Sequence, residues 1–173
     1  MCLTRDVKLR RRIPAEIASE AGLGRNERAL AWATDVEGRH IVATQQALVL
    51  QRNPPTYERI GWESIERASY AEGVLAVALV PDTNGTVARL RIPIGDALDL
   101  PVVVRDRVTA SIVINQHMAL QGRKGVRVVA RRAADGSALR WGYVFDAGLV
   151  ADDHLRAQAE QVLEQVRQES GLD

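Results

Sequence analysis

The stretch Arg59-Ile60-Gly61-Trp62-Glu63-Ser64-Ile65 lies inside a block of short apolar runs, residues 30–80, that decides the fold. Two turns in this block place a glycine after an acid, at Glu37-Gly38 and at Glu72-Gly73. Two-residue turns with glycine second, flanked by apolar runs, are strong hairpin signals. The block therefore predicts a meander of antiparallel strands or a small barrel.

Strands and short helices are expected along most of the chain. The predicted strands are residues 30–36, 39–43, 45–50, 57–60, 65–70, 74–80, 86–94, 126–130 and 139–145. Pro14 fits the first turn of a short helix over residues 15–21, which Gly22 ends. Pro101 starts an amphipathic helix, because Val104, Val108 and Ile112 recur at steps of four. A strand over residues 102–114 is the open alternative, since short apolar runs fit both structures.

The end of the chain predicts a hairpin followed by a helix. Asp135-Gly136 turns the hairpin, and its second strand carries Trp141, Tyr143 and Phe145 on one face. Asp152 or Asp153 caps the helix. Its apolar stripe is Leu155, Ala159, Val162, Leu163 and Val166. This stripe must be buried, because an isolated helix of this length is marginal in water, and the hairpin aromatics are the expected partners.

Composition bounds the class of protein. A chain of 173 residues makes one domain, or one domain with an appendage. Cys2 is the one cysteine, so no internal disulfide is expected. The first 27 residues lack the apolar stretch of a signal peptide, and no apolar run is long enough for a membrane span. We therefore expect a cytoplasmic protein, and its net charge of +1 predicts no whole-molecule attraction to nucleic acid or membrane.

No catalytic or cofactor motif is found in the sequence. His40, His117 and His154 lack a second ligand at metal spacing, and no phosphate-binding glycine loop or nucleophile elbow occurs. Glu63 and Glu66 are close enough in sequence to form a carboxylate pair, but an exposed strand edge is the preferred interpretation. We predict no enzyme activity, no catalytic residue, no metal and no cofactor.

Charge is segregated along the chain. Residues 5–12 carry five basic side chains against Asp6, residues 123–140 carry six against Asp135, and the end from Asp146 is acidic. The tentative binding residues for an anion or a partner are Arg10, Arg11, Arg12, Arg123, Lys124, Arg127, Arg131 and Arg132. The alternatives are a solvated arm and a hairpin neutralised by the acidic end. Such blocks support salt-sensitive attraction to anions and carry no base-specific readout.

The strand meander, the entry at residues 57–65, the Gly73 hairpin and the helix from Pro101 together resemble a bacterial pleckstrin-homology-like domain. The resemblance covers about residues 28–114, and the rest of the chain resembles uncharacterised actinobacterial proteins that carry such a core. It implies a strongly bent, seven-stranded antiparallel sheet capped by a helix and used for binding or scaffolding. Lipid-binding members place several Lys and Arg around the first hairpin. Here that turn is Glu37-Gly38-Arg39-His40, with one Arg beside an acid.

We therefore predict an α+β protein in three parts. These are a basic arm with a short helix (1–27), a pleckstrin-homology-like core (28–114) and an extension made of a β-hairpin and a helix (115–173). Trp62 is expected to be a core anchor. The leading function hypothesis is a non-catalytic interaction module that binds a protein partner or self-associates. The alternative is a nucleic-acid-associated protein that uses the basic arm 5–12 and the basic hairpin 123–132.

Overall fold

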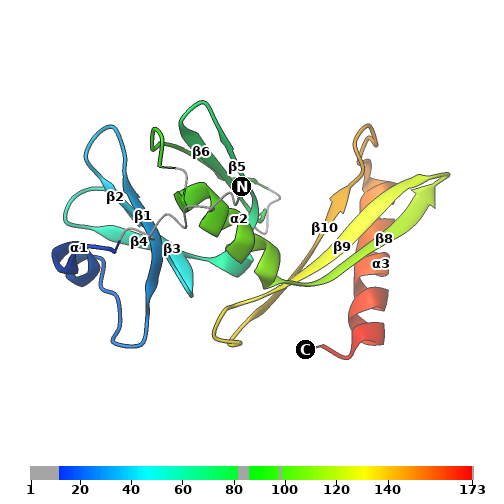
Figure 1. Cartoon of the computed structure of the whole chain (residues 1–173). Helices are drawn as coiled ribbons and strands as arrows, with labels where there is room; N and C mark the ends of the chain where they lie inside the picture. Colours follow the sequence, from blue (N-terminus) through cyan, green and yellow to red (C-terminus); the bar gives the residue numbers. More distant parts are fainter. Residues whose placement is uncertain (1–11, 82–85, 98, 173) are drawn as a thin grey trace, which may run out of the picture.

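The computed structural model describes residues 12–81, 86–97 and 99–172, which form an α+β fold of three antiparallel sheets and several helices (Figure 1). The elements are α1 (Ala15–Glu20), β1 (Ala29–Thr34), β2 (His40–Thr44), β3 (Ala47–Gln51), β4 (Tyr57–Gly61), the 3₁₀ turn η1 (Trp62–Ser64), β5 (Ile65–Ala71), β6 (Val74–Leu79), β7 (Arg89–Pro93), α2 (Asp99–Ser111), β8 (Ile112–Gln121), β9 (Lys124–Arg132), β10 (Leu139–Phe145) and α3 (Asp153–Ser170). The predicted α+β class is confirmed. The barrel alternative is wrong, because none of the three sheets closes on itself in the described residues.

The first sheet has the order β1-β2-β3-β4 and is covered on both faces. Every residue of β3 is buried. Leu48 and Leu50 belong to the main core, while Val49 lies in a second cluster with Ile17 and Ala21 from the α1 region. Successive side chains of a strand point to opposite faces, so a strand that is apolar throughout needs a cover on each side. The short helix α1 supplies one of these covers.

The second sheet, β5-β6-β7, and helix α2 complete the main core. Leu75 and Val77 of β6 pack in one cluster with Leu100 and Val104 of α2. Trp62 lies at the join between the two sheets and is 1% exposed. The prediction that Trp62 is a core anchor is confirmed, and the residue lies in the turn η1 that connects β4 to β5.

The hairpin predicted at Glu72-Gly73 is confirmed by its backbone angles. Both residues have positive φ, 49° for Glu72 and 77° for Gly73, and they join β5 to β6. Positive φ at both central positions marks the tight turn whose twist matches antiparallel strands. A Cβ on Gly73 would also lie 3.4 Å from the backbone of Gly95. Glycine is favoured here by its positive φ, whereas a Cβ would meet Gly95 at ordinary contact distance.

Helix α2 ends earlier than the sequence predicts. It closes at Ser111, and Val113 and Ile114 already belong to β8. The β-branched run Ile112-Val113-Ile114 favours a strand, and its alternating exposure continues along β8. The helix prediction, which extends from residue 101 to residue 114, is wrong for residues 112–114, and the strand alternative is wrong for residues 102–111. The predicted boundary at residue 114 falls inside a strand.

The C-terminal extension contains one strand more than predicted. β8 pairs with β9, and β9 pairs with β10, so the predicted hairpin is a three-stranded C-terminal sheet. Helix α3 packs on this sheet through Leu155, Ala159 and Val166, while Val126, Val128 and Ala130 of β9 are fully buried. Asp152 caps α3 by accepting a hydrogen bond from the Leu155 N–H at 2.8 Å. Residues opposite each other in an antiparallel pair share a face.

The register of β10 supports the predicted partners of α3. Trp141 lies opposite Ala130, Tyr143 opposite Val128 and Phe145 opposite Val126, so the three aromatics share the face of the buried β9 residues. Burial raises the pKa of Tyr143, and the nearby charge of Glu160 on α3 raises it further. Helix α3 packs against β10 as well as β9, so the second layer of the extension lies where the sequence predicts it.

Figure 1 shows α1 at one end of the molecule and the C-terminal sheet with α3 at the other, with α2 between them. No helix among the described residues is both long and apolar enough to cross a membrane.

Candidate functional site

The predicted basic residues are spread over the molecule. Arg10 and Arg11 lie outside the described residues, and Arg12 is exposed beside α1. Arg123 and Lys124 lie at the turn between β8 and β9, whereas Arg132 lies at the opposite end of β9. Eight steps along a strand at about 3.3 Å each separate the two ends of β9 by roughly 26 Å. The structure therefore does not gather these side chains into one basic surface.

Arg127 and Lys124 are exposed but make contacts within the C-terminal sheet and its following loop. Arg127 donates a hydrogen bond to Asn115 Oδ1 at 3.0 Å, and Lys124 Nζ contacts the Gly148 carbonyl at 3.5 Å. Glu160 and Glu164 of α3 are exposed and form no ion pair with this hairpin among the described residues. The alternative of a hairpin neutralised by the acidic end would require these acids to lie over Arg127 and Arg131. They do not, because the two arginines alternate with the β9 residues that face α3.

Arg131 differs most from its prediction, because its side chain is inside the protein. It is 8% exposed, and its guanidinium donates to the carbonyl of Val108 at 3.3 Å and to that of Glu66 at 2.8 Å. A third bond at 3.3 Å reaches Ser111 Oγ. Burial lowers the pKa of Arg131, and the charge of Glu66 partly opposes this effect. Arg131 thus connects β9 to α2 and β5 and does not present its charge on the hairpin surface.

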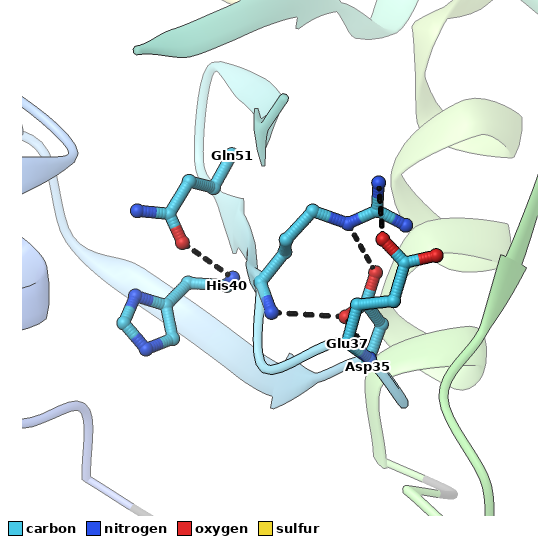
Figure 2. Close-up of polar contacts among 5 residues, drawn as sticks. Asp35, Glu37, His40 and Gln51 are labelled. Atoms are coloured by element: carbon cyan, nitrogen blue, oxygen red, sulfur yellow. Dashed lines mark hydrogen bonds and ion pairs between the residues drawn. The ribbon is translucent and has the colours of Figure 1, made fainter. Parts of the chain in front are cut away.

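The first hairpin turn is closed by its own acid. Asp35 accepts hydrogen bonds from the backbone N–H groups of Glu37 and Arg39, both at 2.9 Å, and from Arg39 Nε at 2.7 Å. Figure 2 shows Asp35 and Glu37 on one side of this turn, with Gln51 bonded to the backbone of His40 beside it. Burial alone would raise the pKa of Asp35, but the bonds from Arg39 and Glu37 hold it below its usual value.

The Arg39 guanidinium pairs with both acids of its own turn. Besides Asp35, it pairs with Glu37 at 3.1 Å. Its pKa is raised mainly by the hydrogen bond to Asp35. Here the local geometry neutralises the arginine that the turn contains.

A groove runs between β5 and α2. It has a volume of about 590 Å³ and is lined by Ala68, Ser69, Tyr70, Leu75, Pro101, Val102 and Arg105. β5 is an edge strand, and its outer side pairs with no strand in the described residues. Val102 of α2 is 58% exposed, an apolar side chain presented to solvent beside an open strand edge. We call this feature the β5 groove.

The sequence gives little signal for the β5 groove. Val102 is one of several valines in an apolar helix, and nothing in its spacing separates it from the buried Val103 and Val104. Arg105 is a single charge on a helix. Only the packing of α2 on β5 turns these residues into the wall of one groove.

Two pairs of titratable side chains remain as candidates for chemistry, His117 with Asp146 and Glu63 with Glu66. Asp146 accepts bonds from His117 Nε2 and from the Gly125 N–H, each at 2.8 Å, on an exposed part of the C-terminal sheet. Its pKa is lowered, first by the His117 bond. Glu63 lies in η1 and Glu66 in β5, where the backbone of Glu66 bonds Arg131. Within the described residues no three His, Cys, Asp or Glu side chains gather as a metal site would require.

The chain matches no protein-family model, and no curated protein matches it.

Proposed function

We propose that the protein is a non-catalytic interaction module whose pleckstrin-homology-like core binds an extended segment of a partner protein in the β5 groove. The fold supports the comparison with that family. The resemblance implies one bent sheet of seven strands capped by a helix, and the chain has a four-stranded sheet, a three-stranded sheet and then a helix. The observation that carries the proposal is the edge of β5, which pairs with no further strand among the described residues, beside the exposed side chain of Val102 on α2.

An extended peptide satisfies both features of the groove. The free backbone groups of an edge strand can pair with a further strand, and the pocket beside them selects side chains. Val102 provides an exposed apolar contact, while the exposed cation Arg105 favours an acidic residue in the partner. The expected ligand is therefore an extended segment that combines apolar and acidic residues.

Two features of β5 limit non-specific pairing at its edge. The pairing of β5 with β6 is irregular between Ile65 and Arg67, and charged Arg67 lies on the strand. Bulges and charges reduce indiscriminate pairing between sheet edges. If the protein self-associates, two copies would pair through the same edge of β5.

The test starts from peptides selected from a random displayed library on the immobilised protein. The affinity of a selected synthetic peptide is then measured by fluorescence anisotropy for wild type and for Val102→Asp and Arg105→Glu. Each change is expected to weaken binding by about tenfold or more, which is about 1.4 kcal/mol. Val150→Asp is the matched control, because Val150 is 83% exposed in the loop before α3. Equal affinity of Val102→Asp and wild type would refute the proposal.

The nucleic-acid alternative has weaker support, because the described basic residues lie at both ends of β9 and beside α1. Binding that depends on phosphate contacts falls steeply with salt. A gel-shift titration of an oligonucleotide against salt separates the two hypotheses. Retention of the oligonucleotide at physiological salt, with loss in Arg123→Gln and Lys124→Gln, would favour the alternative.

A further inference from the structure

A second hollow lies on the other side of α2, where the core meets the C-terminal sheet. It has a volume of about 500 Å³, and its polar lining is Gln45, Gln46, Trp62, Arg107, Ser111 and Arg132. We call it the arginine hollow. Its size falls in the range of small-molecule sites. The lining comes from the β2–β3 turn, from η1, from the last turn of α2 and from the β8 to β10 region.

The charge in the arginine hollow is uncompensated. The side chains of Arg107 and Arg132 form no ion pair or hydrogen bond with any other described residue. No Asp or Glu is part of the lining. Arg131 lies directly behind Ser111, which lines the hollow, and it too lacks a carboxylate in an ion pair among the described residues. The charge of Glu66 offsets part of the Arg131 charge.

The end of α2 opposes anions only weakly. A helix C-terminus carries about half a negative charge, whereas three guanidinium groups carry about three positive charges. Arg131 also bonds the Val108 carbonyl, one of the groups at this helix end. The sum around the hollow is therefore strongly positive.

Trp62 adds an unsatisfied donor. Its indole Nε1 is buried and has no hydrogen-bond partner in the part of the chain that the structure describes. A buried donor without an acceptor costs about 1–3 kcal/mol. Trp62 is therefore both a core anchor and a part of the lining of a hollow that contains free guanidinium groups.

We propose that the arginine hollow binds a small anion through phosphate or carboxylate oxygens. Arg107 and Arg132 are its ligands. Planar guanidinium groups pair with both kinds of oxyanion through two parallel hydrogen bonds. The amides of Gln45 and Gln46 add neutral donors at the rim. The bound anion would contact the core and the C-terminal sheet at once, so it would hold these two parts together.

The test is calorimetric titration of the full chain with inorganic pyrophosphate and, separately, with citrate at constant ionic strength. Wild type is expected to bind at least one of them with a Kd below about 1 mM. Arg107→Gln and Arg132→Gln are each expected to weaken that binding by about tenfold, because each removes a charge-assisted pair. Comparison of the two probes tells whether phosphate or carboxylate oxygens are preferred.

Arg105→Gln is the matched control, since it removes the same charge two residues earlier on the same helix and lines the β5 groove instead. It is expected to leave anion affinity within about twofold of wild type, as surface screening suppresses distant charges. Circular dichroism verifies that each variant is folded.

Two results would overturn the proposal. One is the absence of binding heat for both probes up to about 1 mM. The other is equal loss of affinity in Arg105→Gln and Arg107→Gln, which would show general attraction to a positive protein. Neither result bears on the β5 groove, because peptide affinity is measured independently with Val102→Asp.

Discussion

Trp62 carries more of the core than any other single side chain at the join of the two sheets. It is the largest of the fully buried side chains, and its ring packs with residues from both sheets and from α2. Its neighbours along the chain explain why the sequence identifies it. Ile60 and Ile65 flank it and are also buried, while polar residues fill the positions between.

Removal of this ring is expected to destabilise the protein strongly. Trp62→Ala should lower the free energy of unfolding by about 3–5 kcal/mol, because the substitution leaves a large cavity. Chemical denaturation of the variant measures this value. Arg52→Ala is the surface control, since Arg52 pairs only with exposed Glu58, and exposed pairs contribute about 1 kcal/mol or less. Equal losses in the two variants would contradict the assignment of Trp62 to the core.

Asp35 is the second residue whose role is set by its immediate contacts. Three donors converge on a side chain that is 2% exposed, so its charged form is stabilised inside the turn. The sequence predicts the turn but gives no sign that Asp35 closes it. In the sequence, Glu37 and Arg39 look equally available for binding a partner. In the structure, Arg39 is paired with Asp35 and Glu37.

The lowered pKa of Asp35 predicts a pH dependence of defined sign. The carboxylate stabilises the fold above the pKa of the unfolded chain, about 3.9, and this contribution is lost as the pH falls through the lowered folded-state pKa. Asp35→Asn should therefore cost about 1–3 kcal/mol near neutral pH. The gap to wild type, measured in urea, should shrink below about pH 4. A gap that stays constant down to about pH 2 would refute this explanation.

At the scale of elements, turns were easier to predict than edges. Glu72-Gly73 and Asp135-Gly136 predict two hairpins, because the backbone conformation of each turn depends on its own residues. β8 was missed, because its first residues continue the spacing of four that predicts a helix, and Gln116, His117 and Gln121 make its second half polar. Pairing with β9 stabilises β8, although the sequence of β8 alone does not indicate a strand.

Arg131 illustrates contacts that no local pattern reveals. Its acceptors lie 23 and 65 residues away in sequence, on α2 and β5. Its neighbours Arg127 and Arg132 are exposed, so the composition of the strand suggests one basic surface. Register and packing between elements decide which of these arginines is buried.

Arg131→Ala is expected to loosen the contact between the C-terminal sheet and the core. Loss of three hydrogen bonds should lower the free energy of unfolding by about 1–3 kcal/mol. Hydrogen exchange should accelerate at the end of α2 and at the start of β5. Arg127→Ala is the control on the same face of the same strand, expected within about 0.5 kcal/mol of wild type. Unchanged exchange in Arg131→Ala would show that the two parts are held together by other contacts.

At the scale of the whole molecule, a core of two sheets and α2 is joined to a separate layer of three strands and α3. The two grooves lie on different sides of α2, and each uses residues of that helix. Arg105 lines one and Arg107 the other, so a single helix serves both surfaces. The sequence predicted an interaction module but not these surfaces, because both arise where distant segments meet.

The most direct measurement for the proposed function is hydrogen exchange of the β5 amides with and without a selected peptide. An added strand would bond the backbone groups along the groove part of this edge, so exchange within residues 68–71 is expected to slow by about tenfold or more. The edges β1 and β7 serve as internal references and should remain unchanged. Unchanged exchange in β5 at saturating peptide, with protection elsewhere, would contradict the claim that this protein binds its partner along β5.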